Sequence, residues 1–325
     1  ESAPSYILTS GDPDRPEMNH EVKPGWPFAP PVINFRDGSL KAFAEWLTRS
    51  KNPLFARVAV NRFWQWHFGE GLHKLPNDFG NLGGNPVQPQ LLDWLAAEFV
   101  KRNFSMKQMH RLIVTSDAYK MASTADPLLF AANTKLDPNN TYLWHFRLER
   151  LEAEPIWNSI WAAAGTLDTA VGGPSFDMDS ASGKTSATVR ARISTRKQAK
   201  RRGAYMVRGY SSQRNVVPQF LEAFDVDDGR VPCPLRTQTV TAPQALFMMN
   251  SDTLDQACDQ LAERLTKESG GDLAGAVDLA YRITLARQPS PQELDHALTY
   301  LDHDPARLRS LAWLLFNLDE FIYVR

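Results

Sequence analysis

Polar side chains recur at every fourth position in one segment that is otherwise rich in aromatic and aliphatic residues. The segment spans residues 53–68, and its polar positions are Arg57, Asn61 and Gln65. Residues four apart share a face of an α-helix, so these side chains would form a polar column along an otherwise buried helix. A buried arginine needs a carboxylate, and a buried amide needs hydrogen-bond partners. The column is therefore a structural network, the polar floor of a pocket or an exposed face.

A pocket at this helix would need further polar residues from other parts of the chain. The candidates for such a polar centre are Arg57, Asn61, Arg62, Asp78, Arg111, Glu152 and Arg236. Glu152 and Glu154 are two positions apart, which on a helix directs them to different faces, so we expect an arginine to be the partner of Glu152. The sequence contains no Gly-x-Ser-x-Gly, phosphate-binding loop, dinucleotide fingerprint or His-Glu-x-x-His, so it identifies no catalytic residues.

The histidines, acids and cysteines do not form a metal-binding pattern, and we expect no metal and no cofactor. His67 and His73 are not at helical ligand spacing, and no cysteine accompanies them. Residues 225–230 begin like a calcium loop, but the twelfth position is Arg236, where glutamate is required. The chain has two cysteines, too few for a disulfide framework, and no Cys-x-x-Cys-His haem motif.

Tryptophans and basic residues are the candidates for binding surfaces. Trp26, Trp64 and Trp66 could bind a glycan or a neighbouring domain, although packing also explains the two within residues 53–68. Residues 180–203 contain eight Lys or Arg and no acid, so this stretch could attract a polysaccharide or another polyanion. Few aromatics flank it and the whole chain has a net charge of −1, which argues against nucleic acid as a partner.

The elements that must position these residues are mainly helical. The chain has 325 residues, 43% of them hydrophobic, which is enough for a sizeable core. Caps and periodicity predict helices over 39–49, 53–68, 89–102, 105–122 and 151–167, and others beginning near Thr241, Ser251, Asp272, Ser290 and Pro305. Residues 204–210 are the best strand candidate, and no apolar stretch reaches the roughly 18 residues of a membrane span. We predict a mainly α fold: a multi-helix globular domain with a small β element and an extended Pro-rich N-terminal arm.

A series of motifs, taken in order along the chain, resembles one family. The motifs lie at 52–64 (NPLFARVAVNRFW), 68–72 (FGEGL), 76–80 (PNDFG), 91–96 (LLDWLA), 106–116 (MKQMHRLIVTS), 150–154 (RLEAE), 172–176 (GGPSF), 239–247 (TVTAPQALF) and 320–324 (EFIYV). Together they resemble the planctomycete secreted domain, a module of unknown function in large secreted proteins. The resemblance implies a secreted or periplasmic location and a cytochrome c-like domain in the same precursor. It favours one helical domain over 39–325 after an arm at 1–38, with a basic loop inserted near 178–203.

Three functions fit these observations. The first is an extracytoplasmic module that binds or assembles, through a glycan or a neighbouring domain, within a larger secreted protein. The second is an enzyme acting on a complex carbohydrate, and the third is a redox partner beside a cytochrome c-like domain. An enzyme should bring two carboxylates, or a base and a nucleophile, together in a deep pocket with shifted pKa values. A binding module should present an aromatic platform without such a pair. The chain begins at Glu1 rather than Met, so we also expect it to be part of a longer precursor.

Overall fold

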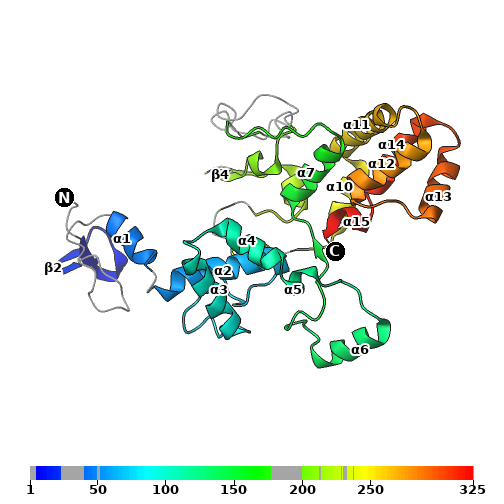
Figure 1. Cartoon of the computed structure of the whole chain (residues 1–325). Helices are drawn as coiled ribbons and strands as arrows, with labels where there is room; N and C mark the ends of the chain where they lie inside the picture. The colour runs from blue at the N-terminus through cyan, green and yellow to red at the C-terminus, as the bar shows by residue number, and fades with distance from the viewer. Residues whose placement is uncertain are drawn as a thin grey trace. The chain divides into compact units, whose positions relative to one another are not determined.

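Helices dominate the computed structural model, which describes residues 5–22, 40–49, 52–173, 175–176, 200–211, 214–227, 229, 233–236 and 238–324 (Figure 1). The strands in these ranges form three separate antiparallel pairs. The prediction of a mainly α fold with a small β element is thus confirmed.

The chain divides into two compact units. Unit 1 contains Glu1–Met121 and Ala132–Trp144, and unit 2 contains Ala122–Ala131 and His145–Arg325. Helix α6 (Pro127–Leu136) contributes residues to both units. The predicted division into an arm at 1–38 and a single domain at 39–325 stays a prediction.

The first described strands lie in the segment that the sequence predicts to be an extended arm. Strands β1 (Ser5–Leu8) and β2 (Pro16–Val22) pair antiparallel around a 3-10 turn, η1 (Thr9–Gly11). Asp12 stabilises the return of the chain, because its side chain accepts the N–H of Asp14. Proline is tolerated at the first position of a strand, as in β2. A Pro-rich composition is therefore compatible with a hairpin as well as with an extended arm. Residues 23–38 of the predicted arm lie outside the described residues.

Helix α2 (Pro53–Phe68) is the centre of unit 1. Asn52 caps it by accepting the N–H of Leu54, and Gly69 ends it with a positive φ of 77°. Its apolar faces pack against α3 (Pro89–Lys101) and α4 (Met106–Val114). Helices α1 (Leu40–Leu47) and α5 (Asp117–Lys120) lie in the same unit. The buried apolar side chains from α2, α3 and α4 include Val60, Phe63, Leu95, Phe99 and Met109.

Unit 2 is built around helices α7 (Ala153–Ala163), α11 (Asp252–Glu268), α12 (Leu273–Leu285) and α14 (Leu308–Phe316). Helix α11 contacts both α12 and α14, and the three lie side by side in Figure 1. Around them lie α10 (Ala242–Asn250), α13 (Pro291–Leu301), η5 (Pro305–Arg307) and α15 (Asp319–Ile322). The predicted caps are present: Ser251 accepts the N–H of Leu254, and Ser290 forms a capping box with Glu293.

Short elements of unit 2 bring distant segments to the start of α7. Strand β3 (Glu149–Arg150) pairs antiparallel with β6 (Tyr323–Val324). The turn η4 (Gly203–Tyr205) packs on α7 so closely that a Cβ on Gly203 would lie 2.8 Å from the Cα of Glu154. The strand predicted over 204–210 is confirmed only at its end, because its first residues belong to η4. Strand β4 (Gly209–Ser211) pairs with β5 (Arg214–Val216). Helix α9 (Gln219–Ala223) follows and contacts α7 and α10.

Within the described ranges, every helix falls short of the length and apolar character that a transmembrane segment needs.

Candidate functional site

The polar column predicted in α2 is present, and its side chains make separate structural contacts. Arg57 forms an ion pair with Asp93 of α3, with Nη2 and Oδ1 2.6 Å apart. Asn61 is fully buried, and its side chain binds the backbone of His73 on both sides: Oδ1 accepts the N–H at 2.7 Å and Nδ2 donates to the carbonyl at 3.0 Å. Gln65 is buried as well. The column thus fastens α3 and the loop after α2, and this arrangement fits the structural interpretation.

The other polar-centre candidates in unit 1 also stabilise local structure. Arg62 donates from Nη2 to Oδ1 of Asn77 at 2.9 Å. Asp78 accepts the N–H of Gly80 at 2.9 Å, which fixes a turn in the same loop. Arg111 is exposed on α4. In the described part of unit 1, the hydrogen bonds and ion pairs of Arg57, Asn61, Arg62 and Asp78 go to other residues, not to one another.

The aromatic candidates differ in exposure. Trp64 is only 8% exposed and stacks on Phe68 with ring centroids 4.3 Å apart, so it lies in the core, and its selection as a binding residue stays a prediction. Trp66 is 61% exposed and lies near Phe63 and His110. Trp26 lies outside the described residues.

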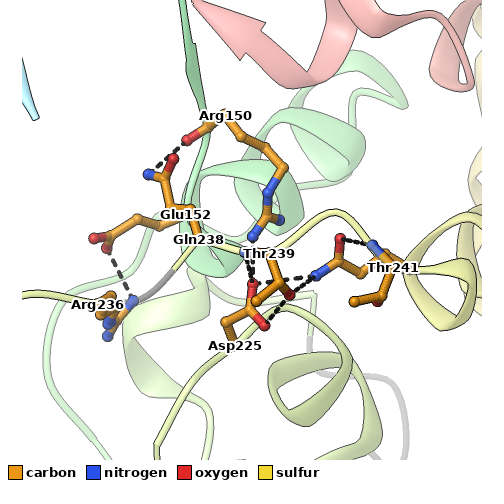
Figure 2. Close-up of polar contacts among 8 residues, drawn as sticks. Arg150, Glu152, Asp225, Arg236, Gln238, Thr239 and Thr241 are labelled. Atoms are coloured by element: carbon orange, nitrogen blue, oxygen red, sulfur yellow. Dashed lines mark hydrogen bonds and ion pairs between the residues drawn. The ribbon is translucent and has the colours of Figure 1, made fainter. Parts of the chain in front are cut away.

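In unit 2, Asp225 is the centre of a hydrogen-bonded network that joins three segments (Figure 2). Its carboxylate accepts Nη2 of Arg150 at 2.7 Å, the N–H and hydroxyl of Thr239 at 2.9 and 2.6 Å, and Nε2 of Gln244 at 3.1 Å. Gln238 adds a bond from Nε2 to the carbonyl of Arg150 at 3.1 Å. The network links β3, the turn after α9 and the start of α10.

Charge and backbone strain are both concentrated at this network. The side chain of Arg150 is 6% exposed, and its guanidinium also lies 5.5 Å from the ring centroid of Phe224. Burial raises the pKa of Asp225, but the hydrogen bonds from Thr239 and the charge of Arg150 outweigh it and hold the pKa below its ordinary value. The backbone of Asp225 has a φ of 64°, a conformation that costs free energy in a residue with a side chain. Four hydrogen bonds hold the carboxylate of the same residue.

Arg236 is the partner of Glu152, as expected, and it binds Glu154 too. Its Nη1 lies 2.9 Å from Glu152 and 2.6 Å from Glu154, and Nη2 lies 2.9 Å from the second oxygen of Glu154 (Glu152 and Arg236 are drawn in Figure 2). The expectation that the two glutamates face different directions is wrong, because Glu152 precedes α7 in extended conformation and helix geometry does not apply to it. Although burial raises the pKa of Glu154, its bonds with Arg236 lower it further than burial raises it.

A cavity of about 1100 Å³ lies beside the Asp225 network in unit 2. Asp225, Thr239 and Thr241 belong to both. One wall is an aromatic cluster in which Trp157 lies 5.4 Å from both Trp161 and Phe220, measured between ring centroids. Half-buried Phe247 continues this wall, 5.4 Å from Phe220. The polar part of the lining consists of amide, hydroxyl and carboxylate groups on or next to α9, α10 and α11, among them Glu222, Asn250, Ser251, Asp252 and Gln256.

The end of the predicted basic loop is packed against this cavity. Lys200 lines it, with Nζ 4.5 Å from the ring centroid of Trp161 and 2.5 Å from Oε1 of Gln260. Arg201 is buried, and its guanidinium lies 4.0 Å from the ring centroid of Tyr205. These two residues at the end of the predicted basic loop are therefore held by contacts with neighbouring side chains. Residues 177–199 lie outside the described residues.

The sequence alone did not identify Asp225, Arg150, Thr239 or Gln244 as a network. A signal existed, because Arg150 begins the RLEAE motif and Thr239 and Gln244 lie in the TVTAPQALF motif. Neither motif predicts that its residues bind Asp225. Among the described residues, no group of three His, Cys, Asp or Glu side chains could hold a metal ion. Cys233 and Cys258 are both free.

The fold and the cavity define a mainly helical protein with a cavity of about 1100 Å³ in its second unit. The family model of PSD1, a protein of unknown function (DUF1553), matches residues 40–301, and the chain belongs to this family. The comparison with curated proteins gave no match, and the comparison with solved structures gave none either.

Proposed function

We propose that this chain is a binding module whose ligand, a saccharide, occupies the cavity of unit 2. The observation that carries this proposal is the cavity itself, which combines about 1100 Å³ of space with an apolar wall and a polar side. Ligand sites are typically concave and largely apolar, with a few polar groups that orient the ligand.

The chemistry of the lining favours a saccharide. A sugar ring has apolar C–H faces, which can pack on Phe247 and Leu246, and hydroxyl groups around its edge. Asn250, Gln256 and Thr241 supply amide and hydroxyl groups that donate and accept hydrogen bonds. Such groups suit a ligand with many hydroxyls better than they suit an alkyl or aromatic ligand, which would leave them unpaired.

Binding is favoured over hydrolysis by the acid–base properties of the carboxylates. A glycosidase needs one carboxylic acid whose pKa is raised so that it can protonate the leaving group. Among the described residues, the carboxyl groups with a shifted pKa are all shifted downward. Asp225, the shifted acid at the cavity, is paired with Arg150 and is suited to holding structure rather than to donating a proton.

An extracytoplasmic location within a larger protein is part of the same proposal. The resemblance of the motifs to a secreted module supports it, and assembly beside a cytochrome c-like domain would be consistent with it. A catalytic role on complex carbohydrate is the alternative that the test below includes.

The test is isothermal titration calorimetry of the purified chain with β-1,4-linked tetrasaccharides, neutral and amino-substituted. The double variant Asn250→Ala with Gln256→Ala removes two exposed lining amides, and each lost hydrogen bond should weaken binding about fivefold to tenfold. Gln292→Ala removes an exposed amide at the start of α13, outside the cavity lining, and should bind as the wild type does. Absence of binding at millimolar saccharide would overturn the proposal, and so would release of shorter saccharides, which would identify an enzyme.

A further inference from the structure

The charges of the cavity lining are unbalanced. Three carboxylates line it, those of Glu222, Asp225 and Asp252, and Lys200 is the one ammonium group among the described lining residues. Asp225 is neutralised by its ion pair with buried Arg150. Glu222 and Asp252 have no ion pair among the described residues, and both are exposed. The cavity therefore offers two carboxylates that no cation of the described structure balances.

Lys200 does not compensate for these carboxylates, because its ammonium group has other contacts. Its Nζ lies over Trp161 and 2.5 Å from Oε1 of Gln260, away from any carboxylate contact. The face of an indole ring attracts an ammonium group, and the face of Trp161 is occupied by that of Lys200. The counter-charges that the cavity offers to a cationic ligand are thus Glu222 and Asp252.

A second, independent feature of the cavity is an indole N–H without an acceptor. Trp161 lines the cavity and is only 3% exposed, and its Nε1 has no hydrogen-bond partner within the described part of the chain. Its neighbour Trp157, by contrast, donates from Nε1 to the carbonyl of Arg201 at 2.8 Å. A buried donor without an acceptor is costly, so the site needs an oxygen from a ligand or a water molecule.

From these observations we propose that the saccharide of this site carries a free amino group, protonated near neutral pH. Glu222 and Asp252 bind the ammonium group, and a ligand oxygen reaches the aromatic wall. This inference rests on the proposed function and names the class of saccharide. An anionic saccharide is disfavoured at this cavity, because it would bring like charge against two carboxylates.

The experiment compares three β-1,4-linked tetrasaccharides of equal length: glucosamine, N-acetylglucosamine and glucose oligomers. At about pH 6 and low salt, we expect the glucosamine oligomer to bind at least tenfold more tightly than the other two, because charge-assisted hydrogen bonds are stronger than neutral ones. Raising the salt concentration from about 0.05 to 0.5 M should reduce this preference, since it screens exposed charges.

Variants of the carboxylates test the assignment. The double variant Glu222→Gln with Asp252→Asn should lose the tenfold preference and keep binding of the neutral oligomers. Asp295→Asn changes an exposed carboxylate of α13 outside the cavity lining and should keep the preference unchanged. Thermal unfolding of each variant checks that it is folded, as expected for exposed positions.

Each result decides between the two proposals. Equal binding of charged and neutral oligomers would overturn the amino-group inference and leave the saccharide site standing. A preference that survives in the double variant would also overturn the inference. Failure of all three oligomers to bind would overturn the proposed function together with the inference.

Discussion

Arg150 and Asp225 are 75 residues apart in the sequence, and Nη2 of the arginine lies 2.7 Å from Oδ2 of the aspartate. This pair connects the strand before α7 to the turn after α9, and Thr239 and Gln244 complete it from the start of α10. Two members of this network, Asp225 and Thr239, line the cavity and form one border of it. The shape of the proposed ligand site therefore depends on an ion pair that is itself nearly buried.

Removing one member of this pair should destabilise unit 2 strongly. Arg150→Gln leaves Asp225 without its cation in a largely buried setting, and the expected loss is about 3 kcal/mol in the free energy of unfolding, measured by urea denaturation. Arg282→Gln is the matched control, because Arg282 and Asp278 form an exposed pair on α12 whose loss should cost at most about 1 kcal/mol. Equal effects of the two substitutions would show that the Arg150–Asp225 pair is not special.

The ion pair between Arg287 and Glu293 predicts a loss of stability in acid. Two hydrogen bonds from Arg287, at 2.8 and 2.7 Å, and the N–H of Ser290 lower the pKa of Glu293 to about 2. Because this pKa is lower in the folded than in the unfolded chain, the stabilisation is complete above about pH 4.5 and disappears as the pH falls toward 2. Urea midpoints measured over this range should decline in the wild type.

The same titration in Glu293→Gln isolates this contribution. The variant should be less stable near neutral pH and should have a flatter pH dependence between about 4.5 and 2. Asp278→Asn, which removes an exposed carboxylate on α12, should keep the slope of the wild type. A slope that is the same in Glu293→Gln would contradict the assignment.

A second pH dependence is expected in unit 1, at His67 and His110. Their ring nitrogens, Nε2 of His67 and Nδ1 of His110, are 2.8 Å apart, and burial followed by the charge of His110 lowers the pKa of His67. Because the folded chain binds this proton less readily than the unfolded chain, stability should fall as the pH decreases below about 6.5. The loss of stability can be followed as a decrease in the melting temperature between about pH 8 and pH 5.

Substitution of the partner histidine provides the check on this effect. His110→Asn removes the neighbouring imidazole that helps to lower the pKa of His67 and should reduce the fall in melting temperature, whereas His296→Gln, at an exposed position of α13, should not alter it. Persistence of the full effect in His110→Asn would refute the role of the pair.

The sequence predicted local structure far better than tertiary pairing. Asn52, Ser251 and Ser290 act as caps where predicted, because a cap depends on residues within one turn. Trp64 and Trp66 could not be told apart, since α2 is apolar on most sides and its periodicity does not reveal which side faces solvent.

The sequence predicts the kind of partner that a charged residue of the candidate site needs, but not where in the chain that partner lies. Charge predicts an arginine as the partner of Glu152. The helical spacing that would direct Glu152 and Glu154 to different faces does not apply, because Glu152 precedes α7. The sequence shows Asp225 only as the first residue of a segment that begins like a calcium loop. Its actual partners lie 75 residues before it and 14 to 19 residues after it. No local pattern encodes such a meeting, which depends on how whole elements pack.

The buried amide of Asn61 should prove indispensable to unit 1. It satisfies both backbone polar groups of His73, and Gly71 passes so close that a Cβ there would lie 2.6 Å from Nδ2 of Asn61. Asn61→Leu would leave a buried N–H and a buried carbonyl without partners, with an expected cost of about 2 to 4 kcal/mol by urea denaturation. Gly71→Ala should destabilise the same loop through steric overlap. Arg62→Ala, which removes an exposed contact to Asn77 from the same helix, should change stability by less than about 0.5 kcal/mol, and a cost for Asn61→Leu as small as that would show that water replaces the amide.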